Sequence, residues 1–203
     1  MAPQPKTFLT PEQYLAIERA AEYKSEYYSG EMFAMAGARE AHNLVVGNAF
    51  GELRQQFRTR PCRVYQSEMR VRISSTGLYT YPDVVVVCGE PQFLDEQRDT
   101  LLNPILVVEA LSPSTEAYDR GRKFEHYKTL DSLRDYLLIA TDHPHADLYT
   151  RQPDGRWLLT SASRMEDTLT IDSIEATLRL ADIYEKVELT TNGMAGPEVH
   201  GLR

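Results

Sequence analysis

Tyr81-Pro82-Asp83 opens an apolar run at residues 84–87, and a second apolar run at residues 105–111 carries one acid, Glu109. The first run is four valines and the second is nearly all aliphatic, which predicts two strands buried on both faces. Asp83 stands at the mouth of the first strand. Glu109 stands inside the second, where a carboxylate is costly unless a partner compensates it. We therefore expect the fold to be organised around these two acids.

Two carboxylates on neighbouring strands repel each other unless a cation lies between them. Oxygen ligands of this kind suit Mg²⁺ or Mn²⁺. A basic residue that follows, Lys123, could orient a nucleophile or stabilise the charge that develops on a phosphoryl group. The alternative is that Asp83 only begins a strand after Pro82 and that Glu109 pairs with an arginine. The three residues together, in this order, favour a metal-dependent site.

The segments around these residues resemble a known family. Pro82-Asp83, Glu109-Ala110-Leu111 and Lys123 resemble the PD-(D/E)xK nuclease pattern with its lysine displaced. Three longer segments are similar to the Uma-two family of restriction-like endonucleases: Tyr-Pro-Asp-Val at 81–84, Val-Glu-Ala-Leu-Ser-Pro-Ser-Thr at 108–115, and Tyr-Asp-Arg-Gly-Arg-Lys-Phe-Glu-His-Tyr at 118–127. The similarity extends from about Thr7 to about Leu189.

The resemblance implies an α/β fold of the restriction-endonuclease type, with a mixed central β-sheet flanked by helices. It also implies Mg²⁺- or Mn²⁺-dependent hydrolysis of DNA phosphodiester bonds. Asp83 and Glu109 would hold the metal, and Lys123 would position the attacking water or help to deprotonate it. Glu26 would hold a second metal or that water, and an exposed strand glutamate is the equal alternative. Restriction-like folds often pair to cut two strands, so the resemblance further implies a homodimer.

The position of the lysine departs from the usual pattern, in which it lies two residues after the glutamate on the same strand. That position here is Leu111, which cannot carry a charge. Lys123 lies instead on a helix predicted from about residue 115 to about residue 130. Asp119, Lys123 and Tyr127 are four residues apart and therefore share one helix face. The alternative role for Lys123 is an ion pair with Asp119 on the helix surface, worth only a few tenths of a kcal/mol.

Two further residues are candidates for contact with nucleic acid. His42, near the start of a helix expected to reach about residue 58, matches a family segment and could contact a phosphate or the water shell of the metal. Local capping or packing is the alternative for His42. Arg120 is a weak candidate within a wider basic set, for which the alternative is a solvated helix face. The rest of that set comprises the arginines of residues 54–63 together with Arg70, Arg72 and Arg122.

The length and the net charge of the chain limit its possible domain organisation and function. The 203 residues suit one domain, expected over residues 1–189, followed by a Gly- and Pro-containing tail at 190–203 that is expected to be disordered. The net charge of −8 argues against nucleic-acid binding, which usually needs a basic footprint. A non-enzymatic nucleic-acid or protein-binding module on the same fold is therefore the alternative, and an enzyme acting on a small phosphate ester is a third possibility.

Apolar segments and cysteines bear on location. No apolar run reaches the roughly 20 residues of a membrane span, and the first residues lack an apolar signal core, so we expect a cytoplasmic protein that does not enter membranes. Two cysteines, Cys62 and Cys88, are too few for a disulfide framework or a zinc site, and we expect both to be reduced core residues. His143 and His145 have no acid or cysteine partner at a metal-binding spacing.

The remaining pattern predicts the other elements. A capping box at Thr10 begins a helix with Tyr14, Leu15 and Ile17 on its buried side. Hairpins are expected at 26–33, at 63–73 with 79–87, and at 146–150 with 157–161, with further strands at 135–140 and 168–171. Residues 89–103 are expected to form a loop with a short helix near 93–98, and residues 181–184 a short helix.

Overall fold

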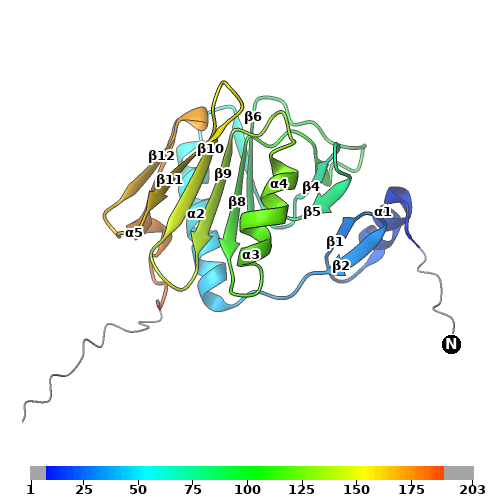
Figure 1. Ribbon diagram of the computed structural model, residues 1–203, viewed down its shortest axis with the longest axis horizontal. Helices are drawn as coiled ribbons and strands as arrows, with labels where there is room; N and C mark the ends of the chain where they lie inside the picture. The colour runs from blue at the N-terminus through cyan, green and yellow to red at the C-terminus, as the bar shows by residue number, and fades with distance from the viewer. Residues whose placement is uncertain (1–7, 190–203) are drawn as a thin grey trace, which may run out of the picture.

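The structure is a computed structural model that describes residues 8–189 (Figure 1). The tail expected at 190–203 lies outside the described residues. The helical elements are α1 (Pro11–Ala20), α2 (Glu40–Gln56), α3 (Glu116–Tyr118), the π-helical η1 (Asp119–Lys123), α4 (Phe124–Tyr127), the 3-10 helix η2 (Asp172–Ile174) and α5 (Leu180–Ile183). None of the helices within residues 8–189 is long and apolar enough to cross a membrane.

Thirteen strands accompany them over residues 8–189. They are β1 (Ser25–Tyr28), β2 (Glu31–Ala34), β3 (Cys62–Gln66), β4 (Arg70–Ile73), β5 (Leu78–Thr80), β6 (Val84–Cys88), β7 (Thr100–Leu101), β8 (Leu106–Leu111), β9 (Asp135–Ala140), β10 (Ala146–Arg151), β11 (Trp157–Ala162), β12 (Thr168–Ile171) and β13 (Ala176–Arg179).

A six-stranded mixed sheet forms the centre, in the order β11-β10-β9-β8-β6-β3. Strands β8 and β9 are parallel, and the other neighbouring pairs are antiparallel. The helical segment from α3 to α4 connects the parallel pair, as a strand–helix–strand order requires. The predicted mixed α/β sheet flanked by helices is therefore confirmed.

The two faces of this sheet are covered by different elements (Figure 1). Alternate residues of β6 and β8, such as Val84 and Val108, pack with α2, α5 and the β12–β13 hairpin. The other residues, such as Val85 and Val107, pack with the segment from η1 to α4 through Phe124. Both strands are thus buried on both faces, as their continuous apolar runs predict.

A second sheet has the order β2-β1-β5-β4-β7. The hairpin expected between 63–73 and 79–87 is divided between the two sheets, because β5 pairs with β4 in this sheet while β6 pairs with β3 in the central one. The chain passes from one sheet to the other at residues 81–83, so Asp83 lies at the junction of the sheets. The turn of the β1–β2 hairpin has Ser29 and Gly30 at φ of 50° and 86°, as a two-residue hairpin turn requires.

Helix α1 begins as expected and differs in its buried face. Thr10 accepts from the backbone of Gln13, whose side chain accepts from Thr10 in return. Ile17, expected to be buried, is 46% exposed, and Glu18 is buried instead. The Glu18 carboxylate accepts hydrogen bonds from Ser25 and from the Tyr81 hydroxyl, which compensates its burial.

Cys62 and Cys88 form a disulfide, so the expectation of two reduced cysteines is wrong. They are 26 residues apart in sequence, but the antiparallel pairing of β3 with β6 places them directly opposite each other. The loop at 89–103 is also corrected. Its expected short helix is absent from the described chain, and Phe93 instead forms a β-bridge with Leu101 of β7.

Candidate active site

Glu109 lies within β8, and Asp83 immediately precedes the neighbouring strand β6. Antiparallel pairing of β6 with β8 sets Val84 opposite Val108, and one further step in that register sets Asp83 opposite Glu109. Side chains on opposed residues of an antiparallel pair share a face and have Cβ atoms about 4.5–5.5 Å apart. Glu109 projects toward the face that the helical segment from α3 to α4 covers, whereas the Asp83 carboxylate reaches the start of α2.

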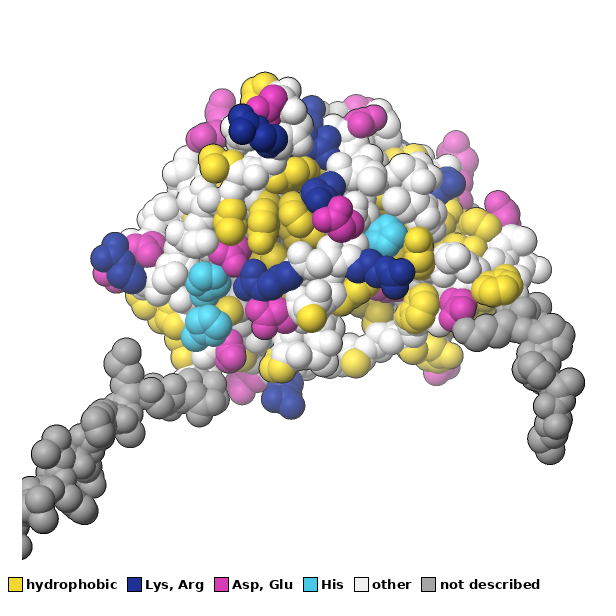
Figure 2. Space-filling view, in the orientation of Figure 1, with side chains coloured by type: hydrophobic (Ala, Val, Ile, Leu, Met, Phe, Trp, Pro, Cys, Tyr) yellow, Lys and Arg dark blue, Asp and Glu magenta, His cyan; other side chains and the backbone are white. Residues whose placement is uncertain are grey.

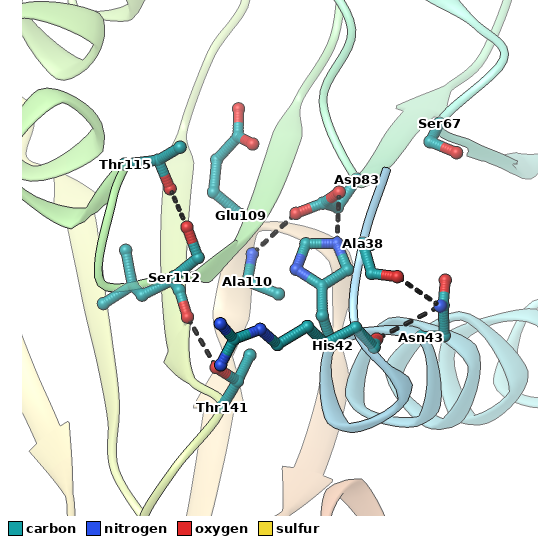
Figure 3. A network of polar contacts seen from close by, with 12 residues as sticks. Ala38, His42, Asn43, Ser67, Asp83, Glu109, Ala110, Ser112, Thr115 and Thr141 are labelled. Carbon is teal, nitrogen blue, oxygen red and sulfur yellow. Dashed lines mark hydrogen bonds and ion pairs between the residues drawn. The ribbon is translucent and has the colours of Figure 1, made fainter. Parts of the chain in front are cut away.

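Asp83 is fixed at both carboxylate oxygens (Figure 3). Its Oδ2 accepts a hydrogen bond of 2.8 Å from the backbone N–H of Ala110, the residue after Glu109. Its Oδ1 lies 3.0 Å from Nε2 of His42, near the start of α2. Burial lowers the pKa of His42, but the hydrogen bond and charge of Asp83 outweigh burial and leave that pKa raised. His42 thus orients an acid of the site.

Glu109 is buried inside β8 and has two close partners. Its Oε1 lies 2.8 Å from Nζ of Lys123 and accepts a 3.1 Å hydrogen bond from the Tyr127 hydroxyl. Burial raises the pKa of Glu109, and the nearby Lys123 ammonium opposes that rise. A charge-assisted pair of this length compensates an acid that would otherwise be costly in the core.

Lys123 is buried among three carboxylates. Besides Glu109, its Nζ lies 3.5 Å from Oδ1 of Asp119 and 3.6 Å from Oε1 of Glu26. Burial lowers the pKa of Lys123, but the carboxylates of Glu109, Glu26 and Asp119 raise it more, so the ammonium stays charged at neutral pH. Lys123 is therefore more than a surface partner of Asp119, as it reaches the acid on the strand.

The position of Lys123 follows from the helical segment that carries it. Residues Asp119–Lys123 form a π-helical turn between α3 and α4, and such turns are frequent at functional sites. The hydroxyl of Tyr136, on β9, donates a 3.0 Å hydrogen bond to the carbonyl of Asp119 and ties this turn to the sheet. The shared face predicted for Asp119, Lys123 and Tyr127 is confirmed, because Lys123 contacts Asp119 while both Lys123 and Tyr127 contact Glu109.

Glu26 comes to the site from β1 of the second sheet. The Thr80 hydroxyl donates to its Oε1, the same oxygen that lies 3.6 Å from Lys123. The structure thus gathers Glu26, Glu109 and Lys123 in one place, with Asp83 opposite Glu109. Sequence reasoning missed Thr80 and the role of Tyr127. A tyrosine one helical turn after Lys123 was the available signal for the second.

Arg120 lies outside this cluster. Its guanidinium donates to Glu116 at 2.7 Å and to Asp147 at 2.6 Å. His145 also contacts Asp147, at 3.1 Å. Any contact of Arg120 with a phosphate would compete with these two acids.

The acids offer oxygen donors for a metal ion. Within residues 8–189, no group of three or more His, Cys, Asp or Glu side chains is arranged to hold one. Mg²⁺ is usually bound through only one or two carboxylates, with waters and substrate phosphates completing the shell. Asp83, just before β6, and Glu109 of β8 present four carboxylate oxygens between them and fit that requirement. Glu26, expected to hold a second metal or the attacking water, contacts the Lys123 ammonium in the structure, and its expected role stays a prediction.

A mixed sheet with an acid just before one strand, a second acid within the next and a lysine in contact with that second acid is typical of a restriction-endonuclease-like fold. The chain belongs to the Uma2 family, described as "Putative restriction endonuclease", whose family model matches residues 11–182. The resemblance stated from the sequence is thereby confirmed.

Relatives support the family assignment and the fold. The chain is 37% identical over 183 residues to the uncharacterized protein slr1290 of Synechocystis sp. (strain ATCC 27184 / PCC 6803 / Kazusa), covering 90% of this chain and 94% of the relative. It is also 37% identical over 152 residues to the uncharacterized protein sll1609 of the same organism, covering 75% and 86%. The crystal structure of a "putative nuclease belonging to DUF820" from Anabaena variabilis ATCC 29413 matches with a TM-score of 0.69 at 17% identity, over 87% of this chain and 98% of the other, and shows the shared fold.

Proposed function

We propose that this protein is a metal-dependent endonuclease that hydrolyses DNA phosphodiester bonds. The observation that carries the proposal is the 2.8 Å contact between Lys123 and Glu109, with Asp83 immediately before the opposing strand β6. This contact supplies the acid–acid–lysine set of a PD-(D/E)xK site although the lysine comes from a helix. The family description supports the same activity class.

Each residue has a distinct part in the proposed reaction. Asp83 and Glu109 would hold Mg²⁺ or Mn²⁺, which when bound would offset their mutual repulsion and polarise the scissile phosphate. Lys123 would donate hydrogen bonds to the attacking water and to the phosphoryl oxygens as negative charge develops. Because the pKa of Lys123 is raised, a positioning role is favoured over removal of a proton. Glu26 would hold the ammonium at the reacting position.

A plasmid cleavage assay tests this function. With Mg²⁺ or Mn²⁺ the protein should nick or cut plasmid DNA, and a chelator should stop it. Lys123→Met should slow cleavage about a hundredfold or more, as expected when one positioned charge is removed. Asp83→Asn, at a less buried position, should do the same and also weaken Mn²⁺ binding in calorimetry. The matched control is Lys128→Met, at the end of the same helical segment, where the ammonium pairs with the exposed Glu125 and stands over the Phe124 ring.

The rival functions predict other results. A non-enzymatic binding module would bind an oligonucleotide equally well with and without a chelator and would never cut it. An enzyme for small phosphate esters would hydrolyse a simple phosphodiester while leaving plasmid intact. Full cleavage by both Lys123→Met and Asp83→Asn would remove the proposed site.

Pairing of two chains belongs to the same proposal, because cutting both strands of DNA needs two sites. Light scattering should then give a mass near twice 23.2 kDa. A monomer mass at all concentrations would contradict the homodimer and leave single-strand nicking as the expected activity.

A further inference from the structure

A pocket of about 280 Å³ adjoins the acid cluster. Its lining includes Glu26, Tyr28, Phe33, Tyr118, Arg122 and His126. These residues come from the β1–β2 hairpin on one side and from the segment between α3 and α4 on the other. Figure 2 shows basic, histidine and apolar side chains gathered on the face between these elements.

The pocket is connected to the proposed reaction centre by two residues. Glu26 lines the pocket and also lies 3.6 Å from the Lys123 ammonium. Arg122 is the immediate neighbour of Lys123 in the π-helical turn. A group in this pocket would therefore lie next to a phosphate held at Lys123.

Aromatic side chains give the pocket its walls. The rings of Tyr28 and His126 pack edge to face, with centroids 4.7 Å apart. Phe33 is 50% exposed although it is a large apolar residue on a hairpin. Burial raises the pKa of Tyr118 to about 12, so its hydroxyl stays neutral and can donate a hydrogen bond. These walls suit a flat, polarisable ligand.

Arg122 contributes a cation to the pocket. Within the described chain its guanidinium forms no ion pair with a carboxylate, whereas Arg120, two residues earlier, forms two. It stands over the Tyr28 ring, 6.0 Å from the centroid. An exposed guanidinium held over an aromatic ring can stack on a second flat group or bind a phosphate.

His126 provides a buried polar atom without a partner. The residue is only 8% exposed, and its Nδ1 is buried with no hydrogen-bond partner among the described residues. Burial, and secondarily the charge of Arg122, lowers the pKa of His126, so the neutral ring offers one donor and one acceptor. Buried polar atoms in native proteins are nearly always paired, so this nitrogen needs a partner, which is either a water molecule or a group in the pocket.

We propose that this pocket receives one unstacked nucleobase of the DNA strand, adjacent to the phosphate that is cut. The inference rests on the proposed function and adds a substrate class to it: single-stranded or locally opened DNA. A base inside a duplex has both faces stacked, so it must leave the stack before aromatic walls can enclose it. Tyr28 and Phe33 would contact its faces, Arg122 would stack on it or bind its phosphate, and His126 would hydrogen-bond its edge.

The test separates recognition of the base from cleavage. Binding is measured by fluorescence anisotropy in EDTA, where no metal-dependent cut can occur, with a single-stranded 12-nucleotide probe. A second probe has the same phosphates but abasic sugars throughout. Wild-type protein should bind the normal probe about tenfold or more tightly than the abasic one, as expected for stacking of a base on aromatic side chains. Free deoxynucleotide, added as competitor, distinguishes a base that binds alone from one that needs its strand.

Two surface variants and one control complete the experiment. Phe33→Ala and Arg122→Gln, both at exposed positions, should reduce the preference for the normal probe at least threefold while unfolding like wild type. Arg98→Gln is the matched control, since Arg98 also stands over a ring, that of Phe93 at 4.4 Å, but lies outside the pocket lining. It should leave the preference unchanged.

The possible outcomes distinguish this inference from the proposed function. Equal affinity of wild type for normal and abasic probes would overturn the inference even if plasmid is cut. A preference that survives in both Phe33→Ala and Arg122→Gln would also overturn it. A preference that both variants lose would support it, even if no cleavage is found and the nuclease assignment fails.

Discussion

At the scale of single residues, the site depends on one buried cation shared by three acids. Lys123 lies 2.8 Å from Glu109 and within 3.6 Å of Asp119 and Glu26. Breaking a buried pair by removing one partner is strongly destabilising, because an uncompensated charge stays behind. The arrangement is not symmetric, because Lys123 contacts three carboxylates whereas those three carboxylates share this one ammonium.

This asymmetry predicts unequal costs for two substitutions. Lys123→Met leaves three carboxylates without their cation and should lower the free energy of unfolding by about 3–5 kcal/mol. Glu109→Gln leaves the ammonium with two acids and keeps an acceptor for Tyr127, so its cost should be smaller by about 2 kcal/mol. Urea unfolding of both variants in EDTA measures the difference. Equal costs would mean that Asp119 and Glu26 contribute little to the burial of Lys123.

At the scale of elements, the local sequence pattern predicted most of the helices and strands but fewer of the pairings between strands. Runs such as residues 84–87 indicate buried strands because β-branched side chains fit a covered sheet, and the Thr10 capping box marks the start of α1 through local hydrogen bonds. The split of β5 and β6 between two sheets and the opposition of Cys62 and Cys88 depend on partners far apart in sequence. Spacing alone contains no information about such pairings.

The site was predictable to a similar degree. Asp83 before β6 and Glu109 within β8 lie where the two apolar runs indicate, and their roles stay predictions. That Lys123 would reach Glu109 could be expected only through the family resemblance, because the distance depends on how the helix packs over β8. The pocket beside Glu26 had no signal in the sequence, since its walls come from two segments about 90 residues apart.

The helical origin of the lysine gives a prediction for the elements themselves. Leu111 is buried on the same face of β8 as Glu109, two residues further along, where the usual pattern has its lysine. Adding Leu111→Lys to Lys123→Met should restore part of the cleavage rate and of the stability lost, because a strand lysine about 6–7 Å from Glu109 can reach the same space. Plasmid cleavage and urea unfolding are measured together on each variant.

The control for that experiment uses the other neighbour on the strand. Val107 is as buried as Leu111 and lies two residues before Glu109 on the same face. Val107→Lys with Lys123→Met places the same charge at an equal distance in the opposite direction, and it should restore no cleavage. Recovery in both double variants would show that a nearby positive charge suffices, and recovery in neither would mean that only the helix can aim the lysine.

At the scale of the whole molecule, the acid cluster and the pocket both lie where the second sheet meets the central one. Glu26 and Tyr28 belong to β1, while Glu109 belongs to β8, so the relative placement of the two sheets sets the site. The overall charge of −8 would repel DNA, and at this junction four carboxylates outnumber the cations Lys123 and Arg122, so a phosphate there would need the metal ion proposed for Asp83 and Glu109. Contacts that hold the second sheet together therefore matter for function.

One such contact lies on Asp99. Its carboxylate accepts hydrogen bonds of 2.8 and 3.0 Å from Arg19 of α1 and lies 2.9 Å from the buried Arg70 of β4. The hydrogen bonds from Arg19, supported by Thr100 and Arg70, lower the pKa of Asp99 from 3.8 to about 2. Asp99 therefore links α1, through Arg19, to β4, through Arg70.

The lowered pKa sets the sign of the pH dependence. A carboxylate with a depressed folded-state pKa contributes stability above its unfolded value near 3.8 and loses it as the pH falls through about 2. Solvent screening reduces the effect at this partly exposed group, so Asp99→Asn should cost about 1 kcal/mol at pH 6. In urea unfolding series, the difference in the free energy of unfolding between wild type and Asp99→Asn should narrow from pH 4 downward. Asp154→Asn, which breaks a solvent-exposed pair with Arg156, is the control and should show almost no difference from wild type at any pH. A constant gap for Asp99→Asn from pH 6 to pH 2.5 would mean that Asp99 acts through its shape and hydrogen bonds and that its charge contributes nothing to the link.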